Sequence, residues 1–349
     1  MRPQPPMYIP PLWEARMAET RYGMAINRAL ADAMQADPSV VLFGEDVAVP
    51  GGPFAVTRGL LSKFGPERVR DTPISEATIA GAAVGAAMGG LKPVVEIMFM
   101  DFVTLAMDAL VNQAAKAHFM FGGQCSIPMV VRTPHGGGLN AGPQHSQCLE
   151  AWFAHVPGLK VVVPSNPADA YALLRAAIAD PDPVVFIENK TLYSMKGELA
   201  DAPPPVAIGS ARIAQSGSDA TIVTYGATVA AALKAAGSLA AEGVTAEVID
   251  LRSVQPWDER MVLESVAKTR RLIVVHEAVT PFGVGAEIAA RISELAFDGL
   301  AAPVIRVGAD FMPVPFARSL ELGYLPRDTD IAAAVRRSLN WKSNTRIKP

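Results

Sequence analysis

The strongest constraint on the fold is a regular alternation of short apolar runs with segments of helical spacing. The helical spacing over 22–37 ends at Asp37-Pro38 and is followed by an apolar run at 40–43. The same order recurs along most of the chain, and runs such as 93–98 are rich in β-branched residues, as strands buried on both faces are. The pattern predicts an α/β fold with doubly wound parallel sheets. The expected strands are 40–43, 69, 93–98, 128–132, 159–163, 183–187, 221–225, 245–251, 271–275 and 303–307, and the expected helices are 22–37, 76–89, 102–121, 167–179, 227–242, 257–268 and 285–297.

This alternation is interrupted once, near residue 200. Residues 197–205 read GELADAPPP, and three consecutive prolines can continue neither a helix nor a central strand. A length of 349 residues also fits two domains. We expect an N-terminal arm (1–17), a first domain (18–200), a linker (201–209) and a second, smaller domain (210–349).

Composition excludes several classes of protein. The 31 basic residues against 34 acidic ones form no basic stripe, which argues against nucleic-acid binding. The longest apolar stretch, 79–91, is broken by glycines and is shorter than the roughly 18 residues of a membrane span. Two cysteines, with no apolar leader in the Pro-rich N-terminus, favour a reducing, cytoplasmic location. Only 19% of residues are charged, so we expect other subunits to cover part of the surface.

Common local site motifs are absent from the sequence. No G-x-G-x-x-G follows the first expected strand, and no G-x-x-x-x-G-K-[ST] occurs. Neither H-E-x-x-H nor G-x-S-x-G is present, and the cysteines lack metal-ligand spacing. A self-contained nucleotide, metal or serine-hydrolase site is therefore disfavoured.

A carboxylate at the start of a glycine-lined helix is the first unusual feature. Residues 71–76 read DTPISE, and Gly81, Gly85 and Gly89 follow at four-residue spacing. Glycines at this spacing lie along one side of a helix, where another element can approach closely. Each costs about 1 kcal/mol relative to alanine, so a packing partner must compensate. The simpler interpretation is that Ser75 caps the helix and Glu76 only favours its dipole.

Two further segments carry candidate site residues. Residues 133–147, TPHGGGLNAGPQHSQ, form a Gly-rich loop in which His145 can serve as acid, base or hydrogen-bond donor, and a flexible surface loop is the alternative. Glu45 follows the first expected strand, at the end where open parallel sheets bind ligands. Phe102 lies beyond the expected strand at 93–98. The simpler interpretations are an ordinary loop for Glu45 and core packing for Phe102.

These segments belong to a longer series of motifs. From about residue 21 to 339, the order of these motifs along the chain resembles that in the β subunit of the E1 component of 2-oxo acid dehydrogenase complexes. This family of thiamine-diphosphate enzymes includes pyruvate, branched-chain and acetoin dehydrogenases. The motifs are FGEDV (43–47), DTPISE (71–76), AGAAVGAAMGG (80–90), QAAK (113–116), FGG (121–123), QHSQ (144–147), PGLKVVVPSNPADA (157–170), DPVVFIENK (182–190), LYSMKGE (192–198), EVIDLRSVQPWD (247–258) and GVGAEI (283–288).

The resemblance implies an architecture and roles for individual residues. It implies a transketolase-like pyrimidine-binding domain followed by a transketolase C-terminal-like domain. Glu76 would hydrogen-bond N1′ of the cofactor's aminopyrimidine and promote the imino form that removes the thiazolium C2 proton. Phe102 would stack on the aminopyrimidine, and Glu45 would lie in an acidic channel between active sites. His145 would face the substrate or the incoming lipoyl group, where it can donate to developing negative charge.

The resemblance also implies metal ions and partners. The family binds the cofactor's diphosphate through Mg²⁺ and a Gly-Asp-Gly motif, which this sequence lacks. The Mg²⁺ ligands would therefore come from an E1α subunit in an α2β2 heterotetramer, which would pass acyl groups to the lipoyl domain of an E2 acyltransferase. A potassium site of mostly backbone carbonyls is also implied. Its expected ligands are Met129, Ala177, Ile178, Asp180 and Asp182.

The expected activity is oxidative decarboxylation of pyruvate, with acetoin as the alternative substrate. A branched-chain substrate is less favoured because Gln144 stands where those relatives usually carry tyrosine. A non-catalytic assembly scaffold is a rival of a different class, but such a chain has no need for Glu76, Phe102 and His145. A self-sufficient transketolase-like homodimer is disfavoured by the missing diphosphate motif.

Overall fold

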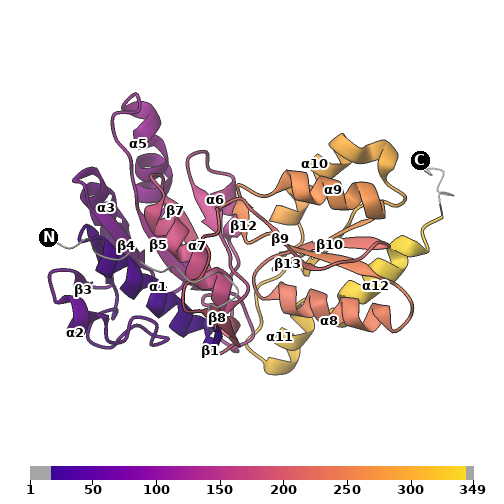
Figure 1. Cartoon of the computed structure of the whole chain (residues 1–349), viewed down its shortest axis with the longest axis horizontal. Coiled ribbons are helices and arrows are strands. Elements are labelled where there is room, and N and C mark those ends of the chain that lie inside the picture. The colour runs from indigo at the N-terminus through magenta and orange to yellow at the C-terminus, as the bar shows by residue number, and fades with distance from the viewer. Residues whose placement is uncertain (1–16, 343–349) are drawn as a thin grey trace, which may run out of the picture.

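The computed structural model describes residues 17–342 as two α/β halves with one sheet each, lying side by side along the long axis (Figure 1). Apart from Met17, the expected N-terminal arm lies outside the described residues. The expected α/β class with parallel sheets is confirmed, and antiparallel strands are added at some edges. None of the described helices is long and apolar enough to cross a membrane.

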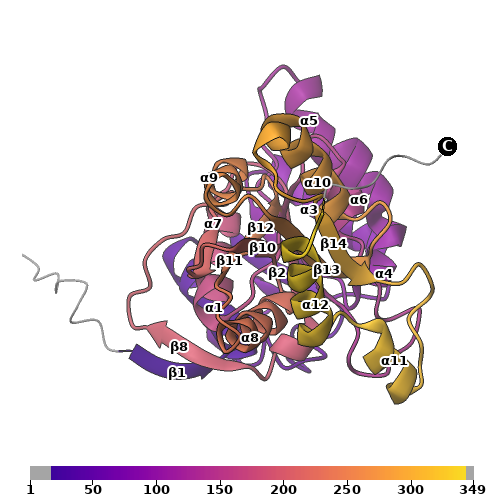
Figure 2. The same cartoon turned by 90° about the vertical axis from the view of Figure 1, so that its right-hand side faces the viewer.

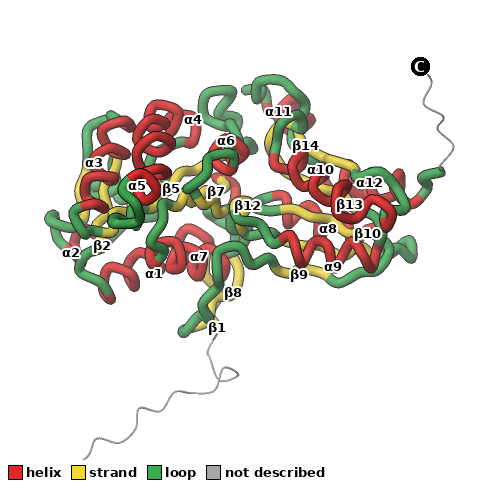
Figure 3. The backbone as a smooth tube through the Cα atoms, turned by 90° about the horizontal axis from the view of Figure 1, so that it is seen from above, coloured by secondary structure: helices red, strands yellow, loops and turns green. Residues whose placement is uncertain are grey.

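The first sheet has seven strands in the order β12-β6-β7-β5-β4-β2-β3, parallel except for β12. Both of its faces are covered: Val94 packs in the apolar cluster that contains α1 and α7, and the next residue, Val95, packs in the cluster that contains α3. Figure 3 shows these helices on opposite sides of the sheet. The strands are β2 (Val40–Gly44), β3 (Val69–Asp71), β4 (Lys92–Glu96), β5 (Val130–His135), β6 (Lys160–Val162), β7 (Val184–Asn189) and β12 (Ser253–Gln255).

The helices of the first half follow the expected order, with two short helices added at 60–64 and 150–154 and one expected helix divided. The expected helix over 102–121 is helical but not uniformly α, because a 3₁₀ turn (Thr104–Ala106) and a π-helical segment (Asp108–Ala114) lie between α4 and α5. Such π segments commonly occur at functional sites. The helices are α1 (Tyr22–Ala36), α2 (Leu60–Phe64), α3 (Glu76–Met88), α4 (Met100–Val103), α5 (Ala115–Met120), α6 (Glu150–Ala154) and α7 (Pro167–Ala179).

The second sheet has five strands in the order β14-β13-β10-β11-β9, with β9 antiparallel to β11. Helices α8 and α12 lie on one side of it and α9 and α10 on the other (Figure 1). Strand β9 and helices α11 and α12 have no counterpart among the expected elements. The elements are β9 (Arg212–Gln215), β10 (Ala220–Thr224), α8 (Thr228–Ala240), β11 (Ala246–Asp250), α9 (Glu259–Thr269), β13 (Leu272–Val279), α10 (Val284–Ala296), β14 (Ile305–Ala309), α11 (Arg318–Tyr324) and α12 (Asp328–Leu339).

The connection between the halves is more ordered than the sequence suggested. Strand β8 (Lys196–Ala200) pairs antiparallel with β1 (Met17–Arg21), in a two-stranded ribbon at the margin of the molecule (Figure 2). Residues 201–211 contain neither helix nor strand. The chain then contributes β12 to the edge of the first sheet. A hydrogen bond of 2.5 Å from Ser165 Oγ to Asp250 Oδ2 also joins the halves.

Candidate active site

Two buried glutamates meet at the carboxyl edge of the first sheet. Glu45 directly follows β2, and Glu76 begins α3, which follows the neighbouring strand β3. Because parallel strands end at the same edge, the topology brings both carboxylates to one place. Each side chain is only 5% exposed, so neither is an ordinary solvated loop residue. Ser75 makes no capping hydrogen bond at this helix.

The two carboxylates influence each other. Burial, followed by the negative charges of Glu76 and Asp46, raises the pKa of Glu45 to about 7. Glu45 Oε1 is buried and has no hydrogen-bond partner among the described residues. A buried acceptor without a donor is energetically costly. The pair can therefore share a proton and accept a hydrogen bond from a bound polar group.

Aromatic rings form a second group beside this edge. His145 packs edge-on against Phe102, at 5.4 Å between ring centroids, and against Phe99 at 4.9 Å. Helix α3 packs against the helical turn that follows Phe102, which places the rings next to the helix that begins at Glu76. The structure therefore brings Phe102 and His145 together, as expected if both face one ligand.

Lys190, which the sequence did not single out as a site residue, fixes the position of His145. Its side chain is only 4% exposed, and Nζ donates a hydrogen bond to the backbone carbonyl oxygen of His145. The same ammonium lies 5.4 Å from the centre of the Phe99 ring. Burial lowers the pKa of Lys190, against the opposing effect of Asp101. A lysine immediately after an apolar strand was the available sequence signal.

The Gly-rich loop is anchored by the second half of the chain. Glu277 on β13 accepts a hydrogen bond from the backbone N–H of Gly137 (2.6 Å). Glu321 on α11 accepts hydrogen bonds from the backbone N–H groups of Gly138 and Asn140, both at 2.9 Å. The loop therefore has a defined conformation, and the flexible-loop alternative does not hold. Glu321 is 2% exposed, and burial raises the pKa of Glu277.

A buried ion cluster lies along the same edge of the first sheet. Arg132 on β5 donates to Glu188 at 2.7 and 2.8 Å and to Glu96 at 2.6 Å. All three side chains are almost fully buried. Tyr193 also donates to Glu188, at 2.7 Å. The cluster pairs the carboxyl ends of three adjacent strands and so fixes the edge from which the site residues project.

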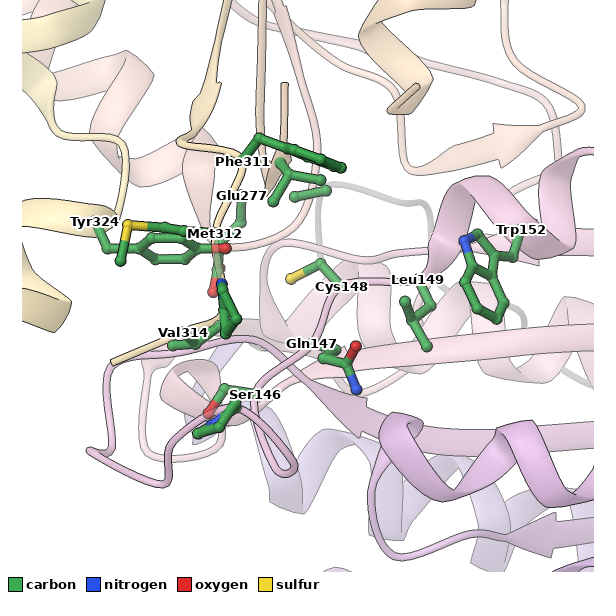
Figure 4. Close-up of a pocket in the computed structure, with 14 residues that line it drawn as sticks. Ser146, Gln147, Cys148, Leu149, Trp152, Glu277, Phe311, Met312, Val314 and Tyr324 are labelled. Carbon is green, nitrogen blue, oxygen red and sulfur yellow. The ribbon is translucent and has the colours of Figure 1, made fainter. Parts of the chain in front are cut away.

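A cavity of about 520 Å³ lies next to the segment that carries His145, between the two halves. Its wall combines residues that follow His145 with residues of β13 and of the loop after β14 (Figure 4). The wall is mostly apolar, and Glu277 is its acidic member. Labelled lining residues are Ser146, Gln147, Cys148, Leu149, Trp152, Glu277, Phe311, Met312, Val314 and Tyr324.

The expected potassium ligands lie around the C-terminal end of α7. Lys160 Nζ is 2.7 Å from a carboxylate oxygen of Asp180 and 3.1 Å from one of Asp182. The ammonium group of Lys160 therefore pairs with both carboxylates. A potassium ion at this place would have to be coordinated mainly by backbone carbonyl oxygens. The expected ligands are Met129, whose carbonyl oxygen accepts a hydrogen bond from Val184, together with Ala177, Ile178, Asp180 and Asp182.

The glycine line of α3 faces outward. An added Cβ at Gly81 or Gly85 would meet no atom within 4 Å of it. Ile74, just before this helix, is 81% exposed. Within the described chain, no element therefore packs closely against Gly81 and Gly85. This face of α3 has room for a second chain.

Comparison with known families accounts for both halves. The transketolase pyrimidine-binding domain matches residues 18–196, and the transketolase C-terminal domain matches residues 209–331. A solved chain described as a split-gene transketolase in an inactive β4 tetramer superposes with a TM-score of 0.76 at 26% identity. That alignment covers 90% of this chain and 96% of the solved one.

Two curated relatives are similar over most of their length. Pyruvate dehydrogenase E1 component subunit beta-2, mitochondrial, of Oryza sativa subsp. japonica is 47% identical across 93% of this chain and 88% of the relative. The acetoin:2,6-dichlorophenolindophenol oxidoreductase subunit beta of Bacillus subtilis is 46% identical across 89% of this chain and 94% of the relative.

Proposed function

The chain belongs to the β subunits of the thiamine-diphosphate-dependent E1 component of 2-oxo acid dehydrogenase complexes, and from this we propose that it decarboxylates pyruvate together with an E1α subunit. The acyl group would pass to the lipoyl group of an E2 acyltransferase. The observation that carries the proposal is the buried pair Glu45 and Glu76, which lies at the start of a helix whose glycine face is open to a second chain.

The residues at this edge fit the aminopyrimidine of thiamine diphosphate. When bound, the cofactor supplies an electron sink for the electrons released on decarboxylation. Glu76 would hold a proton at the aminopyrimidine N1′, and the unpartnered Oε1 of Glu45 offers a further acceptor at the same place. The half-buried ring of Phe102 provides an aromatic face beside them.

His145 would act on the substrate side of the site. Its ring is held against Phe102 and Phe99, and its backbone is held by Lys190. A histidine fixed in this way can donate a hydrogen bond to negative charge that develops on the reacting oxygen. Because the ring orientation is set before substrate arrives, little reorganisation is needed.

The remaining ligands of the cofactor would come from the partner chain. This sequence has no Gly-Asp-Gly, so Mg²⁺ and the diphosphate would be held by E1α in an α2β2 assembly. The split-gene transketolase chain of similar fold is described as an inactive β4 tetramer, which supports a chain that needs a partner for activity. The backbone carbonyl oxygens near Asp180, at the C-terminal end of α7, would bind a structural potassium ion. Lys160 would remain paired with the carboxylates of Asp180 and Asp182.

Acetoin is the second candidate substrate, because an acetoin-oxidising relative is about as similar to this chain as the pyruvate dehydrogenase relative is. We favour pyruvate and propose a cytoplasmic location, which the two free cysteines support. Steady-state rates of the assembled enzyme with pyruvate, acetoin and branched-chain 2-oxo acids distinguish the substrates. A higher kcat/KM for acetoin than for pyruvate would make acetoin the proposed substrate.

The decisive test is a calorimetric titration of thiamine diphosphate and Mg²⁺, first into this chain alone and then into the chain co-expressed with E1α. Native mass is recorded for both samples. Binding only in a complex with the mass of two α and two β chains is the expected result. Tight Mg²⁺-dependent binding by the isolated chain would show that this chain holds the diphosphate itself and would overturn the shared site.

A further inference from the structure

Three potential metal ligands gather beside the cavity between the halves. His135 ends β5, Glu150 begins α6, and Cys148 stands two residues before Glu150. One ligand atom of each, namely a ring nitrogen, a carboxylate oxygen and the thiol sulfur, lies within 4.8 Å of the other two. The proposed decarboxylation uses none of the three. Residue spacing could not reveal the group, because the Gly-rich loop separates His135 from the other two.

Two of these atoms are buried without a hydrogen-bond partner. His135 is 3% exposed and Glu150 is fully buried, yet His135 Nδ1 and Glu150 Oε2 make no hydrogen bond among the described residues. They are 3.7 Å apart, which is within ion-pair distance but too long for a hydrogen bond between them. Two orphaned polar atoms in one buried place indicate a missing partner, since such groups are nearly always satisfied.

A second contact fixes the orientation of the Glu150 carboxylate. The hydroxyl of Tyr225, on the second half of the chain, donates to Glu150 Oε1 at 2.9 Å. This leaves Oε2 as the oxygen directed at His135. Ligating carboxylates in metal sites are commonly fixed by such a second contact.

We propose that His135, Cys148 and Glu150 bind a divalent cation of the Zn²⁺ type. Imidazole, thiolate and carboxylate together suit Zn²⁺ better than Mg²⁺ or Ca²⁺, which prefer oxygen ligands only. Tetrahedral coordination at normal Zn–N and Zn–O lengths places those two ligand atoms about 3.4 Å apart. The observed 3.7 Å is close to that separation. The thiol sulfur of Cys148 lies within 4.8 Å of both atoms and would complete the site by moving closer to them.

The cavity supplies a route of entry and room for a fourth ligand. Cys148 is partly exposed and lines the wall of the cavity (Figure 4), whereas His135 and Glu150 are buried. A cation entering from the cavity would meet the thiol first. Three protein ligands with one open position are typical of zinc sites that remain accessible to small molecules.

Binding would require the thiol to lose its proton. Burial, and then the negative charges of Glu277 and Glu150, raise the pKa of Cys148. The Zn–S bond would form as the S–H bond breaks, and the proton would leave to solvent through the cavity. No oxidant or reductant is involved.

The bound ion would tie together the elements on either side of His145. It would join the end of β5 to the start of α6, and Cys148 lies only three residues beyond His145. The inferred role is therefore to hold the segment that carries His145, in addition to the contacts from Lys190 and Glu277.

The test uses Co²⁺ as a spectroscopic substitute for Zn²⁺ in the full-length chain, purified with its α partner and stripped with chelator. A thiolate-to-cobalt charge-transfer absorption is expected on titration. Cys148→Ser should abolish this absorption and weaken Zn²⁺ binding at least tenfold, and His135→Asn should also weaken binding. Cys125→Ser, at the other free cysteine, should leave both unchanged.

A second measurement needs no variant. Zn²⁺ should protect Cys148, but not Cys125, from alkylation in the wild-type enzyme, as read by peptide mass spectrometry. The proposal is overturned if the absorption survives in a folded Cys148→Ser variant, or if Zn²⁺ protects neither cysteine. Equal loss of absorption in the Cys125→Ser variant would also overturn it.

Discussion

The ammonium group of Lys190 donates a hydrogen bond to the backbone carbonyl oxygen of His145 and so connects the end of β7 to the segment that carries the histidine. The two residues are 45 positions apart in sequence. Since the side chain of His145 also packs on Phe99 and Phe102, both its backbone and its ring are fixed.

Lys190→Met should reduce kcat/KM about tenfold while leaving assembly intact, because a hydrogen bond from a charged donor contributes about 1.5–3 kcal/mol. Lys196→Met serves as the control, because Lys196 is an exposed lysine that pairs with Glu19. Equal effects of both substitutions would rule out a specific role for Lys190.

Glu76→Gln should assemble normally and bind the partner, but its turnover should fall by about 10²–10⁴-fold, the usual contribution of a positioned acid or base. The amide keeps the size of the side chain and removes its ability to hold and release the proton. Native mass and steady-state rates are measured on the same preparation. Unchanged turnover in a correctly assembled variant would instead support a scaffold without chemistry.

Glu45 should make the stability of the chain depend on pH. Its pKa is about 7 in the folded chain against an ordinary value of 4.5, so between these values the folded state retains a proton that the unfolded state has released. The free energy of unfolding should therefore fall as pH rises through this window. Glu45→Gln should flatten this dependence, whereas Glu67→Gln, at an exposed side chain, should preserve it. Urea unfolding of the three proteins at several pH values checks this.

Arg132→Met should lower the free energy of unfolding by about 3–5 kcal/mol, because it leaves two buried carboxylates, Glu96 and Glu188, without their cation. Arg260→Met removes an exposed pair with Glu264 and should cost only about 0.5 kcal/mol. Chemical denaturation of both variants measures the contrast. Similar small losses would show that the cluster contributes little to stability.

Gly85→Leu should block assembly with E1α without unfolding this chain. The added side chain meets nothing within the chain itself but would occupy the space proposed for the partner. Gly237→Leu is a matched control, because Gly237 is also an open helical glycine, on α8 in the second half. Native mass of the co-expressed proteins reads the outcome. Normal assembly of the Gly85→Leu variant would exclude the glycine face from the interface.

Much of the fold could be predicted because central parallel strands are long apolar runs. Strand β13 and helix α7, for example, need no distant partner to be recognised in the sequence. The short strands β1, β9 and β12 escaped prediction, since their pairing depends on neighbours brought near only by the fold. The same holds for β8, which lies partly within the GELADAPPP segment (197–205) that marks the expected domain boundary.

The candidate site was predictable only in part. Glu76 and His145 stand in motifs that a family resemblance identifies, whereas Glu277 acts on Gly137 across 140 residues. No local sequence pattern predicts a contact over this separation. A charged residue inside the apolar run of β13 was the one available signal, because acidic side chains are rarely buried without a partner.

Strand β12 prevents the protein from being divided into two independent fragments at the connection between the halves. Because residues 253–255 supply the outermost strand of the first sheet, a proteolytic cut in the 201–209 segment would not release two independent folding units. A fragment ending near residue 200 would expose the backbone of β6 as an open edge, which promotes aggregation. Gene fusions or swaps that exchange the second half among relatives must therefore preserve the fit of this strand to β6.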